Sequence, residues 1–170
     1  MVLVVGNKKG ETGETENGHW NTAGRYPRAT RDIDNRLFMP PTKPALTNAC
    51  PCGRAATFAA CCGRYLGTGL PAPDAEALMR SRYTAFVRGD VAHLLATWHP
   101  SQRPATLELE PGIKWLGLDV KRHTPVDATH AEVEFVARSR HQGRGQRLHE
   151  RSRFVREDGH WFYVDGEQLT

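Results

Sequence analysis

Four cysteines fall within one short stretch, residues 50–62, of a chain of 170 residues. They form a C-P-C-G and a C-C-G group, with sulfurs at Cys50, Cys52, Cys61 and Cys62. A segment this short cannot bury a core of its own, so a bound metal ion would have to supply most of its folding energy. Two close pairs of thiolates suit the tetrahedral coordination of zinc. We therefore expect a structural zinc site with these four ligands.

Other uses of the four thiols stay open. The adjacent Cys61 and Cys62 fit a redox pair, four thiolates fit an iron–sulfur cluster, and buried thiols without metal are a third alternative. A closed four-sulfur site leaves no coordination position for a substrate, so we expect no catalysis at the metal.

The chain shows no sign of export or membrane insertion. No run of about 18 apolar residues occurs, and the first six residues, MVLVVG, are too short for a signal-peptide core. We therefore expect a cytoplasmic protein, where disulfides are rare and clustered cysteines favour metal.

The composition divides the chain into three segments. Residues 1–45 are rich in Gly, Glu, Thr and Pro and lack apolar periodicity, so we expect a disordered tail. Met39 is an alternative natural start within it. We expect the zinc segment to span residues 46–66 and a folded domain to span residues 72–168.

Helical signals come first in that domain. Asp74 is a suitable N-cap, apolar residues follow at helical spacing, and Gly89 can end the helix in a left-handed conformation. Asp90 can cap a second helix, which Pro100 stops. Residues 74–99 therefore predict two helices.

Strand signals follow after residue 112. Apolar and charged residues alternate in HAEVEFVARSR, RLHERSRFVRE and WFYVDG, with KWLGLDVKRH as a further candidate. Helices followed by about four antiparallel strands indicate an α+β fold.

Arg82 is the most informative residue of the domain, because it lies in the middle of the apolar stripe of the first helix. A buried guanidinium needs a partner, and Glu150 or Asp165 on the predicted inner strand faces would supply one. We favour an internal ion pair between helix and sheet. The functional alternative is a polar pocket, with walls from Trp98, His99, Trp115 and Tyr163. No catalytic set of side chains emerges, so we favour a protein without enzymatic activity; a small-molecule binder or an enzyme that uses this pocket is the alternative.

One predicted hairpin is rich in arginine. The net charge of the chain is +4 and its pI is about 9.0, which is compatible with nucleic-acid binding. The alternative is a solvated hairpin whose charges prevent edge pairing. The candidate contacts are Arg138, Arg140, Arg144, Arg147, Arg151 and Arg153.

Several motifs together resemble the YchJ family. CPCGRAATFAACCGRYLGTGLPAP resembles the SEC-C zinc motif that opens these proteins, and APDAEALMRSRYTAFVRGDVAHLLATWHP resembles the helical segment that follows. WLGLDV, HERSRFVRE and WFYVDG resemble the family's strands. The resemblance covers residues 49–167.

The resemblance implies a nuclear-transport-factor-2-like (NTF2-like) domain, in which helices pack in the concavity of a curved antiparallel sheet. The SEC-C motif is also similar to the zinc tail of the SecA motor, where it serves protein contacts. Carried over, this implies a zinc-stabilised adaptor that binds a protein partner, with a homodimer through the outer sheet face as a further expectation. Some relatives carry a second SEC-C motif, whereas this chain ends at Thr170 without one, which puts in doubt any function that needs two.

Overall fold

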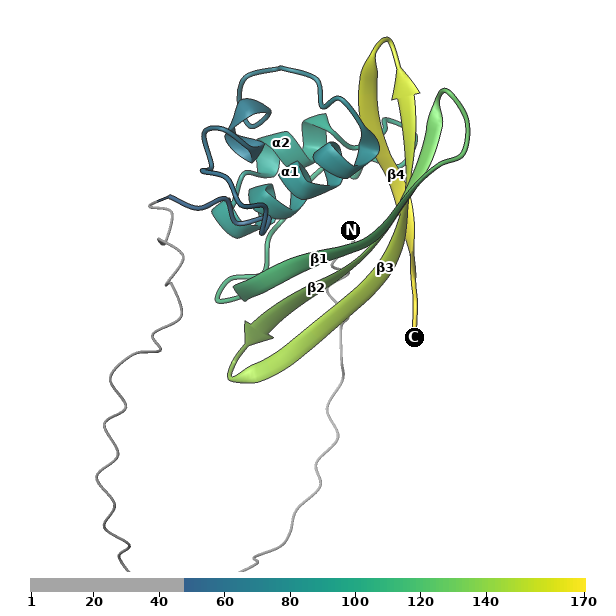
Figure 1. The fold of residues 1–170 in the computed structure, drawn as a ribbon. Helices are drawn as coiled ribbons and strands as arrows, with labels where there is room; N and C mark the ends of the chain where they lie inside the picture. The colour runs from purple at the N-terminus through teal and green to yellow at the C-terminus, as the bar shows by residue number, and fades with distance from the viewer. Residues whose placement is uncertain (1–47) are drawn as a thin grey trace, which may run out of the picture. The chain divides into compact units, whose positions relative to one another are not determined.

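The computed structural model describes residues 48–170. The expectations for a tail over residues 1–45 and for a start at Met39 lie outside the described residues. The described part begins with the cysteine segment, which contains a short 3-10 helix, η1 (Cys62–Arg64). Two α-helices and four strands follow in that order (Figure 1).

The first helix, α1 (Ala75–Arg88), begins and ends where its sequence predicts. The Asp74 carboxylate accepts a hydrogen bond from the Ala77 amide at 2.7 Å. Gly89 closes the helix with a φ of 72°, a conformation that costs a glycine little.

The second helix, α2 (Val91–Ala96), is shorter than its sequence predicts. Asp90 caps it through the His93 amide at 2.9 Å. Beyond Ala96 the backbone pairs with the last strand, since Tyr163 N donates to Thr97 O at 2.9 Å and His99 N donates to Tyr163 O at 2.7 Å. These inter-strand bonds replace the helical ones before Pro100 is reached.

The four strands form one antiparallel sheet in the order β1-β2-β3-β4, as predicted. The strands are β1 (Lys114–Pro125), β2 (His130–His141), β3 (Arg144–Glu157) and β4 (His160–Gln168). The sheet curves around the helices, which lie on its inner face (Figure 1). This is the helix-then-sheet α+β arrangement that the sequence predicts.

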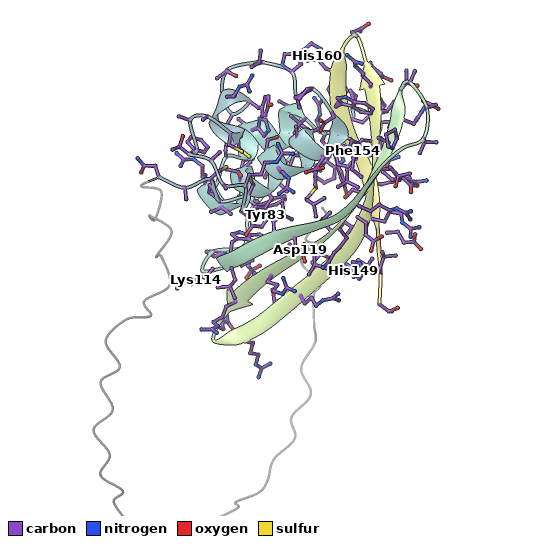
Figure 2. All side chains as sticks on the ribbon, viewed as in Figure 1. Tyr83, Lys114, Asp119, His149, Phe154 and His160 are labelled. Carbon is purple, nitrogen blue, oxygen red and sulfur yellow. The ribbon has the colours of Figure 1, made fainter. Side chains whose placement is uncertain are left out.

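The core lies between α1 and the inner face of the sheet. Tyr83 and Phe154 mark its two sides (Figure 2), and both are buried. The strand residues of the core alternate along β2 and β3, as expected for a sheet with one buried face. They include Ala131, Val133, Phe135, Ala137, Glu150, Ser152 and Phe154.

Among residues 48–170, no helix is long and apolar enough to cross a membrane.

Candidate metal centre and interior polar cluster

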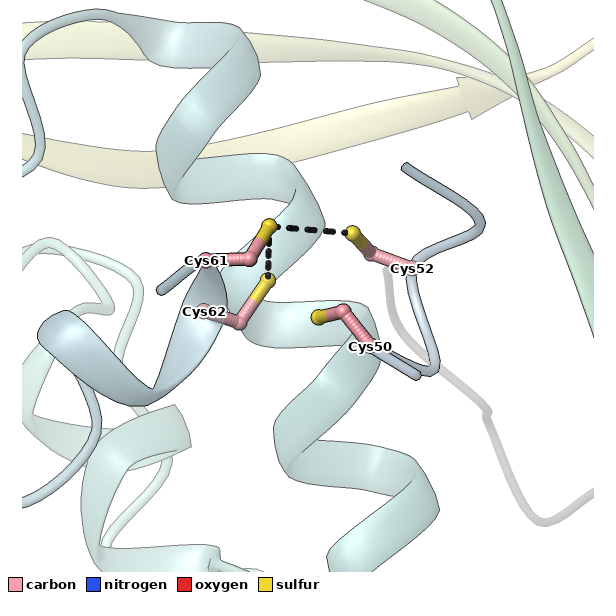
Figure 3. A group of neighbouring side chains, drawn as sticks. All are labelled: Cys50, Cys52, Cys61 and Cys62. Carbon is pink, nitrogen blue, oxygen red and sulfur yellow. Dashed lines mark hydrogen bonds between the residues drawn. The ribbon is translucent and has the colours of Figure 1, made fainter. Parts of the chain in front are cut away.

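The four cysteine Sγ atoms form a cluster beside α1 (Figure 3). All four Sγ atoms lie within 4.8 Å of one another. Cys52 Sγ lies 3.6 Å from Cys61 Sγ, and Cys61 Sγ lies 3.9 Å from Cys62 Sγ. Sulfurs bound tetrahedrally at about 2.3 Å from one zinc ion would be about 3.8 Å apart. The spacing therefore fits a site that can hold a metal ion.

Local backbone turns bring the two cysteine pairs together. Cys50 N donates to Ala56 O at 2.9 Å, and Gly53 N donates to Cys50 O at 3.2 Å. On the second pair, a Cβ on Gly63 would lie 2.8 Å from Phe58 O, so only glycine fits beside Cys62. The C-P-C-G and C-C-G groups thus form two tight turns that face each other.

Crowding sets the thiols' protonation when no metal is bound. A hydrogen bond from the Cys62 thiol is the main cause that lowers the pKa of Cys52 to about 5. The same hydrogen bond raises the pKa of Cys62 above its ordinary value, and burial raises the pKa of Cys61 to about 11. Without a cation the cluster therefore favours one thiolate among thiols, whereas a metal ion stabilises all four thiolates.

The cysteine segment is tied to α1 by charged side chains. Arg80 Nη1 donates to Cys52 O at 3.0 Å, and Arg80 Nε donates to Glu76 Oε1 at 2.7 Å. Arg54 reaches the same Glu76 oxygen at 2.9 Å. Farther along the helix, the Arg88 guanidinium lies 4.2 Å from the centre of the Phe58 ring. The metal centre and the helix therefore form one structural unit.

The sequence did not identify Arg80 as a residue of the cysteine site. Its position one helical turn after Glu76 suggests only an exposed ion pair within the helix. Its hydrogen bond to Cys52 O joins segments that lie 28 positions apart in the sequence.

Arg82 points into the interior, as its place on the helix predicts. It is fully buried, and its Cζ lies 5.4 Å from the centre of the Trp98 ring and 4.6 Å from that of Tyr163. Nη1 donates to Leu94 O at 2.7 Å and to Thr97 Oγ1 at 2.8 Å. Burial lowers the pKa of Arg82 to about 10, and the nearby Tyr163 and Glu150 act in the opposite direction.

Several buried donors around Arg82 have no hydrogen-bond partner. They are Nε and Nη2 of Arg82 and Nε1 of Trp98, whereas the Tyr163 hydroxyl interacts with the Glu150 carboxylate. Burial raises the pKa of Tyr163, so this hydroxyl keeps its proton. The cluster therefore presents unpaired donors from Arg82 and Trp98.

Of the two predicted partners of Arg82, Glu150 lies near it in the interior. Glu150 is buried on the inner face of β3 and acts on Arg82 electrostatically, while its Oε1 accepts a 2.7 Å hydrogen bond from Ser152. The hydrogen bonds of Arg82 go instead to Leu94 and Thr97.

The prediction that Asp165 faces Arg82 is wrong. Phe154 pairs with Tyr163 but Arg153 pairs with Asp165, so β4 contains one extra residue at Val164. This bulge reverses the alternation of side chains, and the Asp165 carboxylate binds Arg153 on the outer face, with Arg153 Nε at 2.6 Å. Asp165 there lines a charged depression of about 400 Å³ with Glu132, Arg151, Arg153, Gly166 and Glu167.

Two further predicted pocket residues, His99 and Trp115, do not hydrogen-bond to Arg82. His99 Nε2 lies 3.2 Å from Glu157 Oε1, and its Nδ1 lies 2.7 Å from Ser101 Oγ. The Trp115 ring packs on Tyr83 and Phe86, with ring centres 5.5 and 5.8 Å apart. Both side chains have structural partners of their own.

A groove opens elsewhere, between residues 65–72, α2 and the start of β4. Its volume is about 290 Å³, and its lining includes Leu70, His93, Thr97, Trp161 and Phe162. None of the seven predicted pocket residues lines this groove. The sequence missed it because residues 65–72 carry no periodic pattern.

The predicted arginines lie on exposed parts of β2 and β3. Arg151 Nη1 lies 4.0 Å from Glu167, and Arg153 binds Asp165. Arg138 and Arg147 are direct neighbours across the two strands. Arg151 and Arg153 therefore have carboxylate partners, whereas Arg138 and Arg147 face each other.

A cluster of four thiols that can hold a metal ion, fixed to the helical layer of a curved-sheet domain, defines a SEC-C motif joined to an NTF2-like domain. The family model for the SEC-C motif matches residues 47–64, and that for "YchJ, middle NTF2-like domain" matches residues 74–166. The chain belongs to the YchJ family, whose similar members bear the name UPF0225 protein.

Relatives and solved structures agree with this assignment. A UPF0225 protein of Polaromonas naphthalenivorans is 60% identical over 136 residues, which cover 73% of this chain and 100% of the relative. Another, from Methylibium petroleiphilum, is 64% identical over 119 residues, covering 69% and 87%. The solution structure of a SEC-C motif containing protein from Rhodopseudomonas palustris has a TM-score of 0.64 at 32% identity, covering 71% of this chain and 98% of the other. A crystal structure of such a protein from Psychrobacter arcticus has a TM-score of 0.58 at 28% identity, covering 74% and 84%.

Proposed function

We propose that this chain is a zinc-dependent interaction protein without catalytic activity at the metal. The observation that carries the proposal is the meeting of four sulfurs within 4.8 Å, with Cys50, Cys52 and Cys62 all buried. Four thiolates at this spacing suit zinc, and a site of this kind leaves no coordination position for a substrate. Bound zinc would neutralise the thiolates and hold the two turns together.

The zinc segment then acts as a docking element for a protein partner. One side is held against α1 by Arg80 and Arg88, while Arg54, Ala59 and Arg64 are exposed. A surface held rigid by metal and helix loses little conformational entropy when it binds. The homodimer expected from the resemblance stays a prediction.

Two variants separate metal binding from docking. Cys61→Ser with Cys62→Ser should abolish zinc binding, measured as metal per chain by mass spectrometry. Ala59→Glu with Arg64→Glu changes exposed residues only and should keep one zinc per chain. Affinity capture from native lysate, with and without chelator, then compares the partners retained by each form.

We expect the same partner to be lost from both variants and after chelation. A partner that both variants retain would show that docking occurs elsewhere. A protein that carries iron or no metal when purified anaerobically would contradict the zinc site itself.

The donor cluster around Arg82 favours a second candidate function, the binding of a small ligand with acceptor oxygens. The free Nε and Nη2 form the side-on edge of the guanidinium, which matches a carboxylate or a phosphate. The Trp98 ring lies against the same residue, and its indole N–H also lacks a partner. Unpaired buried donors are costly unless a ligand or water accepts from them.

The Trp98 indole N–H resonance reports directly on this site. Titration with acetate and with phosphate should shift that resonance in the parent chain. The shift should disappear in Arg82→Lys, which loses the side-on edge, but not in the control Arg54→Lys. Binding that Arg82→Lys retains, or a crystal structure with ordered water alone on these donors, would exclude the candidate.

A further inference from the structure

Four cations form two cross-strand pairs, staggered over three strands, on the outer face of the sheet. Arg138 of β2 lies directly opposite Arg147 of β3, and Arg140 of β2 lies directly opposite Lys114 of β1. Arg138 and Arg140 are two positions apart on one strand, so all four residues share a face. All four are exposed. We call Lys114, Arg138, Arg140 and Arg147 the basic patch.

Lys114 lies at the end of β1 that faces the β2–β3 hairpin (Figure 2). Its membership cannot be inferred from the hairpin's sequence alone, because it depends on the register between β1 and β2. Arg144, the first residue of β3, pairs with His141 and by strand alternation lies on the opposite face from the patch.

Like charges directly opposite each other destabilise a sheet. The charge of Asp119 acts on Arg138 from beyond ion-pair distance. Within residues 48–170, no ion pair involves any patch residue. Asp119 is bound to Lys121 at 2.5 Å, and Glu134 is bound to His149 at 2.8 Å. Glu110 lies 3.8 Å from His141.

The next arginines along β3 are neutralised. Arg153 makes two hydrogen bonds to Asp165, and Arg151 lies 4.0 Å from Glu167. Arg147 lies 3.4 Å from His149 Nδ1 and in no ion pair with a described carboxylate, so β3 carries arginines with and without a carboxylate partner. This contrast distinguishes the basic patch from a generally solvated basic surface.

We propose that the basic patch binds the phosphate backbone of a nucleic acid. Strand geometry places neighbouring cations roughly 5 Å apart across the sheet and about 7 Å apart along it, so one polyanion can contact several at once. Three of the four cations are arginines, whose planar forks match phosphate oxygens. The large apolar side chains exposed among the described residues are all aliphatic, so no exposed Phe, Tyr or Trp is offered for base stacking. The basic patch therefore recognises phosphate groups and does not discriminate between base sequences.

The test uses the full zinc-loaded chain and a fluorescent 20-nucleotide single-stranded RNA, with single-stranded DNA as a second arm. Affinity is measured by anisotropy over a series of salt concentrations. Four phosphate contacts give a slope of log K against log salt of about −2.8. Arg138→Gln with Arg147→Gln should flatten the slope by about 1.4 and weaken binding roughly 10- to 30-fold at 0.1 M salt.

The control is Arg151→Gln with Arg153→Gln. It also removes two positive charges from the outer face. The two variants therefore have the same net charge and differ only in the position of the lost charges. We expect it to change the slope by less than half as much. Thermal unfolding of both variants checks that each is folded.

Equal effects of the two double variants would show that RNA affinity depends on net charge alone. That result would overturn the proposal. So would tighter binding of polyglutamate or of vesicles containing an anionic lipid, which would assign the patch to an acidic protein or to a membrane. Equal affinity for the RNA and DNA strands supports phosphate recognition, whereas a preference for one sequence contradicts it.

Discussion

The side chain of Glu150 occupies the space that a side chain on Gly166 would take. A Cβ on Gly166 would overlap Glu150 Oε1 and would lie 2.8 Å from its Cγ. The two residues lie on neighbouring strands of the inner face, where Gly166 pairs with Ser152. The absence of a side chain at Gly166 is therefore what lets a carboxylate approach the interior near Arg82.

Gly166→Ala should destabilise the protein by displacing Glu150. We expect a loss of about 1–3 kcal/mol in the free energy of unfolding, the usual cost of overpacking, measured by urea denaturation. Gly145→Ala is the matched control, since nothing lies within 4 Å of a Cβ at that strand position. In a Glu150→Ala background the Gly166→Ala cost should largely vanish. An additive double variant would show that the two residues do not compete for space.

Arg80→Met should weaken metal retention without touching a ligand. It removes the hydrogen bond to Cys52 O and the contact with Glu76, which together are worth about 1–3 kcal/mol. Zinc transfer to a chromophoric chelator should therefore be roughly tenfold faster or more. The exposed Arg64→Met serves as control, and equal rates in the two variants would contradict a positioning role for Arg80.

Removal of the proposed zinc ion should loosen the cysteine segment more than the sheet. The segment would lose the ion that holds its two turns, whereas the sheet keeps its own core. Limited proteolysis after chelation should cut first within residues 50–66, and added zinc should restore protection. Simultaneous loss of protection in β2 and β3 would show instead that the domain unfolds with its metal centre.

His93 should make stability depend on pH. Burial, and then the charge of Arg82, lower the pKa of His93 to about 4. The unfolded chain binds this proton at about pH 6.5, so the folded state loses stability as pH falls from about 6.5 to 4. The full effect is about 3 kcal/mol. His93→Gln should flatten the stability–pH curve in this window relative to the parent, whereas the exposed His160→Gln should not.

The features that were predictable from the sequence are those with local causes. Asp74, Asp90 and Gly89 mark helix ends through bonds made within one turn, and alternation along β2 needs only a single strand. The cysteines are likewise close in sequence. These signals predict the order of elements and the metal cluster.

The features that the sequence did not reveal depend on register and on distant contacts. A single extra residue at Val164 moves Asp165 to the outer face, and alternation alone cannot locate such a bulge. Lys114 joins the basic patch only through its pairing with Arg140. Arg80 reaches Cys52 because the cysteine segment folds back on α1.

The pairing of Trp98 with Tyr163 also bears on aggregation. β4 is an edge strand, and an exposed strand edge can recruit strands from other molecules. The backbone of residues 97–99 already occupies the donor and acceptor of Tyr163 on that edge. An invading strand would have to displace Trp98, which lies against the buried Arg82. Resistance to amyloid-like growth at β4 is therefore coupled to the integrity of the protein interior.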